Sequence, residues 1–290
     1  MSDGALSRDW PAPAKLNLFL HITGRQADGY HTLQTVFQFL DYGDRLAFGV
    51  RDDGQINRVN GPEAVPADDD LVVRAARRLR EAAGLDTGAD IYLEKRLPLQ
   101  AGLGGGSSDA ATTLVALNRL WRAGLSTEQL AAVGLELGAD VPVFIHGQAA
   151  WAEGVGERLT PLEDLPEPWF LVVQPLVQVS TREIFQAPEL TRNSPPITIA
   201  GFRADAGHND FEPVVRSRYP EIAAALDWLT DQEPAGGSAR LTGSGSCVFK
   251  AFPGAEHAEA AKALMPRGWQ AFIARGCNRS PLWQRLAEES

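Results

Sequence analysis

The chain has 290 residues, of which 44% are hydrophobic and 22% charged, and its formal net charge is −10. This length predicts one large or two medium domains, and the composition is typical of a soluble globular protein with a substantial core. The negative charge argues against broad electrostatic binding of nucleic acid or of an anionic membrane. A small anionic ligand is not excluded, because its site needs only local amides and single lysines.

The two cysteines, Cys247 and Cys277, are too few for a disulfide framework. The first ten residues, MSDGALSRDW, contain no apolar segment that would predict a signal peptide. The longest apolar stretches, such as WFLVV at 169–173, are far too short to span a bilayer. We therefore expect a cytoplasmic protein with neither a membrane nor a nucleic acid as its partner.

The first predicted element is a half-buried strand over residues 14–24, in which leucines alternate with Lys15 and Asn17. This alternation places Lys15 and Asn17 on the same face. The elements predicted next are a turn through Asp28-Gly29, one or two strands over 35–50, a helix over 69–84, a strand over 91–98, and helices over 108–121 and 127–138. Residues 139–157 are predicted to form a loop and then a strand-like segment.

The acidic, proline-rich segment DLPEPW at 164–169 is the best candidate for a domain boundary. The elements predicted beyond it are a strand over 170–179, helices near 181–190 and 212–230, a glycine-rich turn and strand over 240–252, a helix over 255–264 and a strand near 269–275. Strands and helices are mixed without a strict alternation. The predicted fold class is therefore α+β, with two domains over residues 1–164 and 165–290.

The segment PLQAGLGGGSSDAA at 98–111 holds four glycines within five positions, between a predicted strand and the start of a predicted helix. The N–H groups of a first helical turn have no helical partners, and the helix dipole adds positive charge, so this loop predicts an anion site. Ser107 and Ser108 could add hydroxyl donors, or one of them could reach a magnesium ion. The alternative is a plain turn with Ser as helix N-cap, but a cap needs one serine and not four glycines.

Two familiar glycine loops are excluded. The Walker pattern requires Gly-Lys-Ser/Thr at its end, and Gly106 is followed by Ser107. The dinucleotide fingerprint requires Gly at position 107. A second glycine stretch, LTGSGSCVF at 241–249, alone favours only a tight turn or a bulge.

Three segments together resemble the GHMP kinases, a superfamily of small-molecule kinases. They are PAKLNLFLHITGRQADGYH, PLQAGLGGGSSDAA and RLTGSGSCVF, in the order and spacing of the three motifs of that superfamily. The segments DGYHTLQTVFQFLDYGD at 28–44 and LGADVPVF at 137–144 narrow the resemblance to the GHMP kinases that act on 4-diphosphocytidyl-2-C-methyl-D-erythritol. The resemblance covers nearly the whole chain.

The resemblance implies a ribosomal-protein-like α/β N-terminal domain and a ferredoxin-like α+β C-terminal domain. It also implies that ATP, with Mg²⁺, phosphorylates the 2-hydroxyl of 4-diphosphocytidyl-2-C-methyl-D-erythritol in the non-mevalonate route to isoprenoid precursors. One departure is Asp70, which stands where many relatives carry an Asn near the adenosine. Lys95, just before the glycine loop, lies near the nucleotide in relatives.

The site residues follow from matching these motifs. Asp140 is the candidate base and Lys15 its charge partner; the alternatives are a loop Asp that caps a turn and an exposed strand lysine. The residues expected to hold ATP are Gly102, Leu103, Gly104, Gly105, Gly106, Ser107, Ser108 and Asp109. Those expected to contact the substrate are Asn17, Tyr30, His31, Phe37, Thr181 and Phe185.

By resemblance, Tyr30, His31, Phe37 and Phe185 form the cytidine pocket, in which Tyr30 and Phe185 sandwich the cytosine while His31 reads its edge. Taken alone, Phe37 and Phe185 are more typical of a core. The remaining histidines, His21, His146, His208 and His257, have no metal-ligand spacing, so no metal held by protein ligands is predicted.

Three other functions compete with this hypothesis. The first is a GHMP kinase for a different alcohol, the second a nucleotide-binding regulator without chemistry, and the third a dehydrogenase. The aromatic and histidine cluster in DGYHTLQTVF argues against the first, and the presence of both Lys15 and Asp140 argues against the second. The pattern leaves open whether the chain is a monomer or a weak homodimer.

Overall fold

The computed structural model describes residues 6–26, 29–203, 207–234 and 237–288; Asp28 of the predicted turn lies outside the described residues. The strands are β1 Ser7–Arg25, β2 His31–Arg51, β3 Ile56–Asn60, β4 Gly88–Glu94, β5 Ala150–Glu153, β6 Arg158–Pro161, β7 Trp169–Gln174, β8 Arg240–Leu241, β9 Val248–Phe252 and β10 Gln270–Cys277. The helices are α1 Leu71–Ala83, α2 Gly105–Leu120, α3 Thr127–Leu137, α4 Val141–His146, α5 Thr181–Gln186, α6 Ile199–Arg203, α7 Glu212–Arg218, α8 Pro220–Thr230, α9 Ala255–Ala263 and α10 Pro281–Glu288, with a 3-10 turn at Ala67–Asp69.

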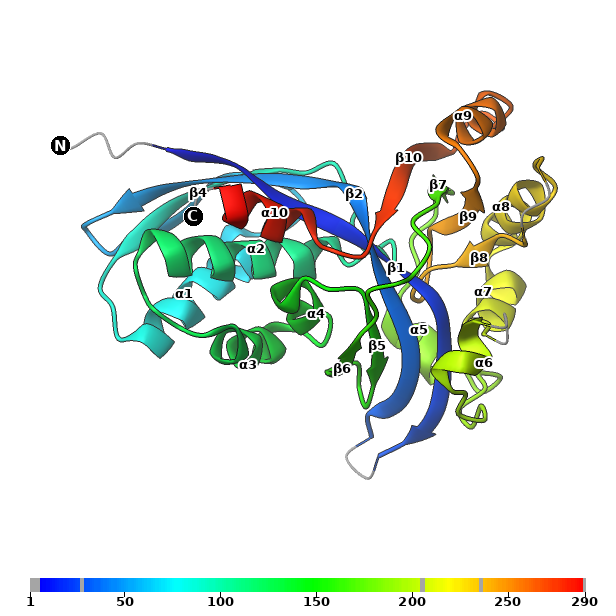
Figure 1. The fold of residues 1–290 in the computed structure, drawn as a ribbon, viewed down its shortest axis with the longest axis horizontal. Coiled ribbons are helices and arrows are strands. Elements are labelled where there is room, and N and C mark those ends of the chain that lie inside the picture. Colours follow the sequence, from blue (N-terminus) through cyan, green and yellow to red (C-terminus); the bar gives the residue numbers. More distant parts are fainter. Residues whose placement is uncertain (1–5, 27–28, 204–206, 235–236, 289–290) are drawn as a thin grey trace.

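Two lobes share a mixed sheet, in which the described strands run in the order β3-β4-β2-β10-β7-β9-β8, with β1 and β5 also paired to β2. β3 and β4 are parallel, and the other pairs are antiparallel. Figure 1 shows β1 and β2 passing from one lobe into the other, with α1 to α4 gathered below one part of the sheet and α7 to α9 beside the other. Both helices and strands are therefore present in each lobe, which confirms the predicted α+β class.

β1 carries Lys15 and Asn17 opposite Phe39 and Phe37 of β2. The prediction of a half-buried strand was wrong, because both faces of β1 are covered. Lys15 and Asn17 are each only 3% exposed. Alternation in a single strand cannot show that loops from distant parts of the chain will cover its polar face. The structure therefore encloses a charged side chain that the pattern predicted to face water.

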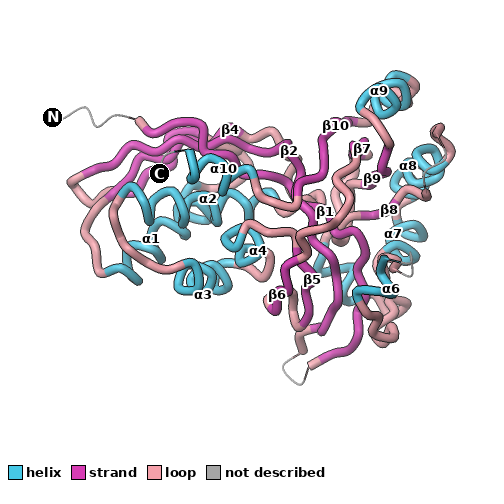
Figure 2. The backbone as a smooth tube through the Cα atoms, viewed as in Figure 1, coloured by secondary structure: helices cyan, strands magenta, loops and turns pink. Residues whose placement is uncertain are grey.

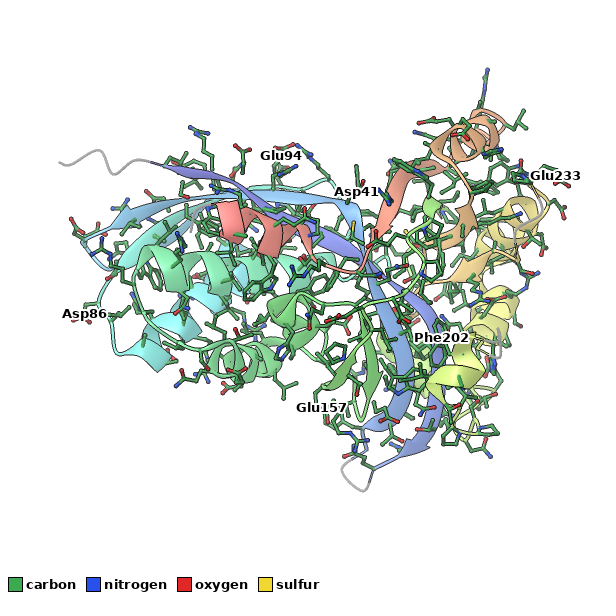
Figure 3. The ribbon with its side chains drawn as sticks, in the orientation of Figure 1. Asp41, Asp86, Glu94, Glu157, Phe202 and Glu233 are labelled. Atoms are coloured by element: carbon green, nitrogen blue, oxygen red, sulfur yellow. The ribbon has the colours of Figure 1, made fainter. Side chains whose placement is uncertain are left out.

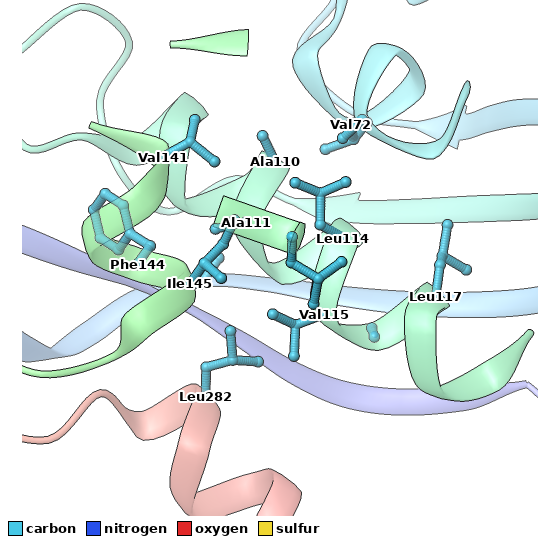
Figure 4. Close-up of a cluster of buried hydrophobic side chains, with 14 of the residues drawn as sticks. Val72, Ala110, Ala111, Leu114, Val115, Leu117, Val141, Phe144, Ile145 and Leu282 are labelled. Carbon is cyan, nitrogen blue, oxygen red and sulfur yellow. The ribbon is translucent and has the colours of Figure 1, made fainter. Parts of the chain in front are cut away.

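The core of the first lobe is built around α2, as Figure 4 shows with side chains from α1, α2, α4 and α10. Leu114 and Leu117 of the predicted stripe are fully buried, but so are Ala110, Ala111 and Ala116, because the sheet lies on one side of α2 and three helices lie on the others. Burial of a leucine side chain contributes about 1.5–3 kcal/mol, so this contact surface dominates the stability of the lobe.

Several predicted boundaries differ from the structure: the helix predicted near 181–190 ends at Gln186, and the strand predicted over 91–98 ends at Glu94. Three further differences have a clear cause. Residues 141–146 form helix α4 and not a loop, since Pro142 lies in the first turn, where a missing N–H costs nothing. The helix predicted over 212–230 is two helices, because Pro220 cannot continue α7 and instead begins α8. The strand predicted over 170–179 ends at Gln174, before Pro175.

The last described elements return to the first lobe. β10 pairs with β2 through Gly276 and Cys277, and Leu282 of α10, which was not predicted, belongs to the core around α2. Figure 2 shows α10 lying among the strands and helices of this lobe. In the part of the chain that the structure describes, no helix has both the length and the apolar character needed to cross a membrane.

A buried charge network fixes the start of α2. The Lys95 ammonium donates to Asp44 Oδ2 on β2 at 2.5 Å and to Asp109 Oδ2 on α2 at 2.8 Å. Asp44 Oδ1 also accepts the backbone N–H groups of Arg96 and Leu97. Burial raises the pKa of Asp109 well above its ordinary value; the Lys95 ammonium opposes this effect, and the Asp44 carboxylate adds to it. Two carboxylates thus share one ammonium, and Asp109 resists ionisation.

We expect Asp109→Asn to stabilise the protein more at pH 8 than at pH 4.5. The unfolded carboxyl ionises near about pH 3.9, while the folded one resists, so wild-type stability is lost as pH rises from there toward the raised folded pKa. Asn keeps an oxygen that accepts from Lys95 and removes the cost of ionising a buried carboxyl. The free energy of unfolding should therefore rise by about 1 kcal/mol, or roughly 2 °C in Tm. Thermal unfolding at both pH values measures it.

The control is Asp86→Asn, which changes an exposed carboxyl and should alter stability by no more than about 0.5 kcal/mol. A difference in Tm between Asp109→Asn and wild type that does not grow with pH would contradict the shared-ammonium account.

Candidate active site

A cavity of about 1490 Å³ lies between β1, β2, the loop before α2, and α5. Many of the predicted site residues line it: Lys15, Asn17, Tyr30, His31, Phe37, Gly102, Gly104, Asp140, Thr181 and Phe185. The other predicted residues belong to the loop and the first turns of α2, where Leu103, Ser108 and Asp109 are buried. The cavity therefore joins residues that lie up to 229 positions apart in the chain, from Lys15 to Ser244.

Lys15 and Asp140 form an ion pair at one end of this cavity. Lys15 Nζ lies 3.4 Å from Asp140 Oδ2, and 2.5 Å from Asn17 Oδ1, which accepts a hydrogen bond from it. The ammonium also stands 5.4 Å from the centre of the Phe37 ring, within the range of a cation–π contact. Lys15 is almost fully buried, whereas the Asp140 side chain is 35% exposed and so can reach a ligand.

Asn17 connects this pair to the rest of the site. Its amide nitrogen donates to Thr35 Oγ1 at 2.9 Å, which orients the side-chain oxygen toward Lys15. Its backbone N–H donates to Thr242 Oγ1 at 3.1 Å. Asn17 is thus held by three hydrogen bonds, so the Lys15 ammonium has a fixed position.

The glycine loop lies against β1, since Lys15 N donates to Leu103 O at 3.0 Å. Gly104 is the N-cap residue of α2, with φ +71°, and no side chain caps the helix among the described residues. A Cβ at Gly104 would lie 3.0 Å from Lys15 Cγ and 2.9 Å from Phe144 Cζ. The predicted alternative of a Ser N-cap is therefore wrong, and the absence of a side chain at Gly104 leaves room for Lys15.

A second turn, residues 242–245, packs on this loop. Thr242 Oγ1 donates to Gly102 O at 3.1 Å, and Ser244 Oγ and Thr181 Oγ1 share a hydrogen bond of 2.6 Å. Gly102 has φ +79°, and a Cβ there would lie 2.1 Å from Thr242 O. The two glycine segments are thus in direct backbone contact.

The opposite end of the cavity is aromatic. The His31 ring stacks on Phe185, with centroids 4.9 Å apart and planes 21° apart, and Phe185 meets Phe211 edge to face. Tyr30 is 66% exposed. Burial lowers the pKa of His31, and the charges of Arg192 and Arg25 lower it further. Its imidazole therefore stays neutral to a lower pH than usual, with one nitrogen able to donate and the other to accept.

The charged side chains of the cavity are mostly cationic. Among the described residues that line it, four cations, Lys15, Arg25, Arg182 and Arg192, face one carboxylate, Asp140, in a chain whose formal net charge is −10. Figure 3 shows carboxylates such as Asp86, Glu94 and Glu233 at the outside of the molecule. A cationic cavity in an acidic protein favours anionic ligands.

Asp70 and Lys95, both singled out in the sequence, have structural partners. Asp70 accepts Val72 N at the start of α1 and pairs with Arg58 at 2.5 Å, so the charge that Asp adds there is neutralised. Lys95 is held by Asp44 and Asp109. Its ammonium also lies 3.4 Å from where a Cβ at Gly105 would stand, next to the loop.

Several residues of the cavity wall were not among the predicted site residues. Gly243 and Ser244 belong to LTGSGSCVF, whose glycines were the signal that could have marked them. Arg192 donates to the carbonyls of Phe185, Ala187 and Leu190 and so holds the end of α5. No local pattern distinguishes Arg192 from an exposed arginine, since its partners are backbone oxygens.

Comparison with known proteins gives consistent matches along the chain. The family model for the GHMP kinases N terminal domain matches residues 70–148, and that for GHMP kinases C terminal matches residues 198–270. A protein from Nitrosococcus oceani named 4-diphosphocytidyl-2-C-methyl-D-erythritol kinase is 60% identical, over 94% of this chain and 96% of its own length. One of the same name from Alkalilimnicola ehrlichii is 58% identical, over 98% and 96%.

A solved structure is also similar. A crystal structure of 4-(cytidine 5'-diphospho)-2C-methyl-D-erythritol kinase matches with a TM-score of 0.78 and 34% identity, over 94% of this chain and 99% of that one. The arrangement of lobes described above is therefore the fold of that kinase.

We expect Gly102→Ala to destabilise the protein by about 3 kcal/mol or more, because positive φ and the contact with Thr242 O both oppose a side chain. The matched control is Gly84→Ala. Gly84 also has positive φ, +63°, but a Cβ there meets nothing within 4 Å, so only about 1 kcal/mol is expected. Urea unfolding of both variants measures the difference, and equal losses would contradict the close contact of the two turns.

Proposed function

The chain belongs to the GHMP kinases and, within them, to the family of 4-diphosphocytidyl-2-C-methyl-D-erythritol kinases, and from this premise we propose its reaction. It is a small-molecule kinase. The proposed reaction transfers the γ-phosphoryl group of ATP to the 2-hydroxyl of 4-diphosphocytidyl-2-C-methyl-D-erythritol, a step toward isoprenoid precursors. The observation that carries the proposal is the Lys15–Asp140 pair, which stands in one cavity with both glycine segments and the aromatic end.

In the proposed mechanism Asp140 accepts the proton of the substrate hydroxyl as the oxygen attacks the γ-phosphorus. The oxygen–phosphorus bond to ADP breaks, and ADP leaves with the electron pair. Phosphoryl transfer requires positioning and charge stabilisation more than covalent catalysis, and a Lys15 ammonium 3.4 Å from Asp140 supplies both. It pairs with the Asp140 carboxylate and stabilises the charge that develops on the transferred group.

The loop amides and the first turn of α2 would hold the ATP phosphates. Gly102 and Gly104 leave the backbone accessible there, and Ser107 can donate a hydroxyl. Magnesium bound to the phosphates would neutralise their charge. The Ser108 hydroxyl is fully buried and has no hydrogen-bond partner among the described residues, which fits a magnesium ligand. No cluster of three ligating side chains exists in the described chain, so phosphate oxygens and water would complete the shell.

The aromatic end would hold the cytosine. Tyr30 and Phe185 offer faces for stacking, worth about 1–3 kcal/mol per base, and neutral His31 can both donate to and accept from the base edge. Asn17, Phe37 and Thr181 would contact the rest of the substrate. The nearby guanidinium groups of Arg25, Arg182 and Arg192 would attract its diphosphate.

We also propose that the domains divide at residues 164 and 165. The two largest core clusters support this division, because one draws mainly on residues before it and the other mainly on residues after it. A few buried residues belong to the cluster of the other domain: Leu282 packs in the first cluster, and Leu20 and Ile22 pack in the second.

The direct test measures ADP release from ATP and Mg²⁺ in the presence of 4-diphosphocytidyl-2-C-methyl-D-erythritol. Parallel assays replace this substrate with mevalonate, homoserine or galactose. We expect turnover with the cytidylyl substrate alone. Turnover with another alcohol would support the assignment as a kinase but contradict the assignment of the aromatic end as a cytidine pocket. ATP binding without any turnover would favour a regulator without chemistry.

Asp140→Asn should reduce kcat by about 100-fold or more while ATP still binds, because the amide cannot accept the hydroxyl proton. Steady-state kinetics and ATP titration measure the two effects, with Asp86→Asn as the control that keeps its activity. Unchanged kcat in Asp140→Asn would exclude Asp140 as the base.

The KM for the cytidylyl substrate should stay flat from pH 8 to about 6.5 and rise only below it. Because the pKa of His31 is lowered from its ordinary value of about 6.5, the neutral ring persists until the solution is more acidic. His31→Gln should raise KM and remove this acid rise, whereas His146→Gln, at an exposed position, should preserve it. If KM still rises at acid pH in His31→Gln, the rise comes from another titratable group.

A further inference from the structure

The segment of residues 207–212, between α6 and α7, is attached to β1. Leu20 N donates to His208 O at 2.8 Å, and Asp210 N donates to Leu20 O at 2.9 Å. The Asp210 carboxylate accepts the backbone N–H of Ile22 at 2.6 Å and hydrogen bonds from Ser194 and His208. The segment therefore has a fixed place on the strand that also carries Lys15 and Asn17.

Asn209, in the middle of this segment, is 5% exposed and has no part in the proposed reaction. Its side-chain nitrogen donates to Leu241 O and to Gly243 O, each at 2.9 Å. Its side-chain oxygen accepts Phe211 N at 3.0 Å. Both amide hydrogens of Asn209 thus hold the carbonyls on either side of Thr242, which fixes the orientation of the two peptide groups there.

Thr242 passes this constraint to the site. Its hydroxyl accepts Asn17 N and donates to Gly102 O, each at 3.1 Å. Asn17 in turn accepts the hydrogen bond from the Lys15 ammonium. A rotation of the peptides around Thr242 would therefore displace the glycine loop relative to Lys15.

We infer that Asn209 is a positioning residue for phosphoryl transfer, which acts through Thr242 on the alignment of the glycine loop with Lys15. The inference rests on the proposed function, since it assigns the loop to ATP and Lys15 to the reacting groups. Asn209 touches neither group. Its contribution is geometric, and misplacement of reacting groups by a fraction of an ångström to 1 Å reduces rates by up to about 100-fold.

The test compares Asn209→Ala with a matched control, Asn118→Ala. Asn118 is also a residue whose side-chain amide bonds a backbone N–H and C=O, those of Leu125, at 3.0 Å each, but Leu125 is not part of either glycine segment. We expect both variants to lose stability. Asn209→Ala alone should lose about 10–100-fold in kcat, with ATP and substrate KM values changed less than kcat. Equal kcat in the two variants would overturn the inference.

Two further variants test the route. Thr242→Val removes the hydroxyl. In the double variant with Asn209→Ala, the fold-loss in kcat should be smaller than the product of the two single fold-losses, because both substitutions break the same chain of hydrogen bonds. Losses that multiply fully would overturn the route through Thr242. Asn209→Asp should regain kcat relative to wild type as pH falls from 8 to 6, because a protonated carboxyl can donate one of the missing hydrogen bonds. A ratio that stays constant with pH would count against the inference.

Amide hydrogen exchange separates this inference from the proposed function. Exchange over residues 101–106 and 241–245 should accelerate in Asn209→Ala and remain as in wild type in Asn118→Ala. Unchanged exchange over 101–106 in Asn209→Ala overturns the coupling whether or not the enzyme turns over. If exchange over 101–106 is faster in Asn209→Ala but the wild-type protein phosphorylates none of the alcohols, the coupling of Asn209 to the glycine loop stands. Only the proposed reaction is then overturned.

Discussion

The site depends on one close approach, that of the backbone at Gly102 to the backbone at Thr242. A side chain at Gly102 would stand 2.1 Å from Thr242 O, so the two turns can meet only without it. This contact joins the loop before α2 to a turn of the other lobe, 140 residues further along the chain. Asn17 and Lys15 of β1 are bonded to the same pair of turns. The position of the glycine loop relative to β1 follows from it.

Much of the site could be predicted because its residues lie in short, distinctive segments. Lys15 and Asn17 alternate in a strand, and the glycines precede a helix, so each local structure follows from local chemistry. The order of three such segments then identified the superfamily. Asp140 could be selected only through that resemblance, since one Asp after a helix has no pattern of its own, and its role as base stays a prediction.

What could not be predicted depends on contacts between distant residues. The polar face of β1 was expected to face water, but the glycine loop and Asp140 of the first lobe cover Lys15, and Thr242 of the second lobe contacts Asn17. Helix α4 is too short for periodicity to register, and α10 packs where no neighbouring sequence indicates it. Asn209 holds two carbonyls more than 30 residues away, and nothing in its own surroundings marks it.

The return of α10 to the first lobe bears on the order in which the protein can fold during synthesis. Leu282 belongs to the core around α2, and Trp283 Nε1 donates to Ile145 O at 2.9 Å. Until the ribosome has added the second lobe and α10, the core around α2 lacks these contacts. Long-range closure of this kind slows folding and leaves an intermediate prone to aggregation. The first core is thus completed only at the end of synthesis, because the two ends of the chain share it.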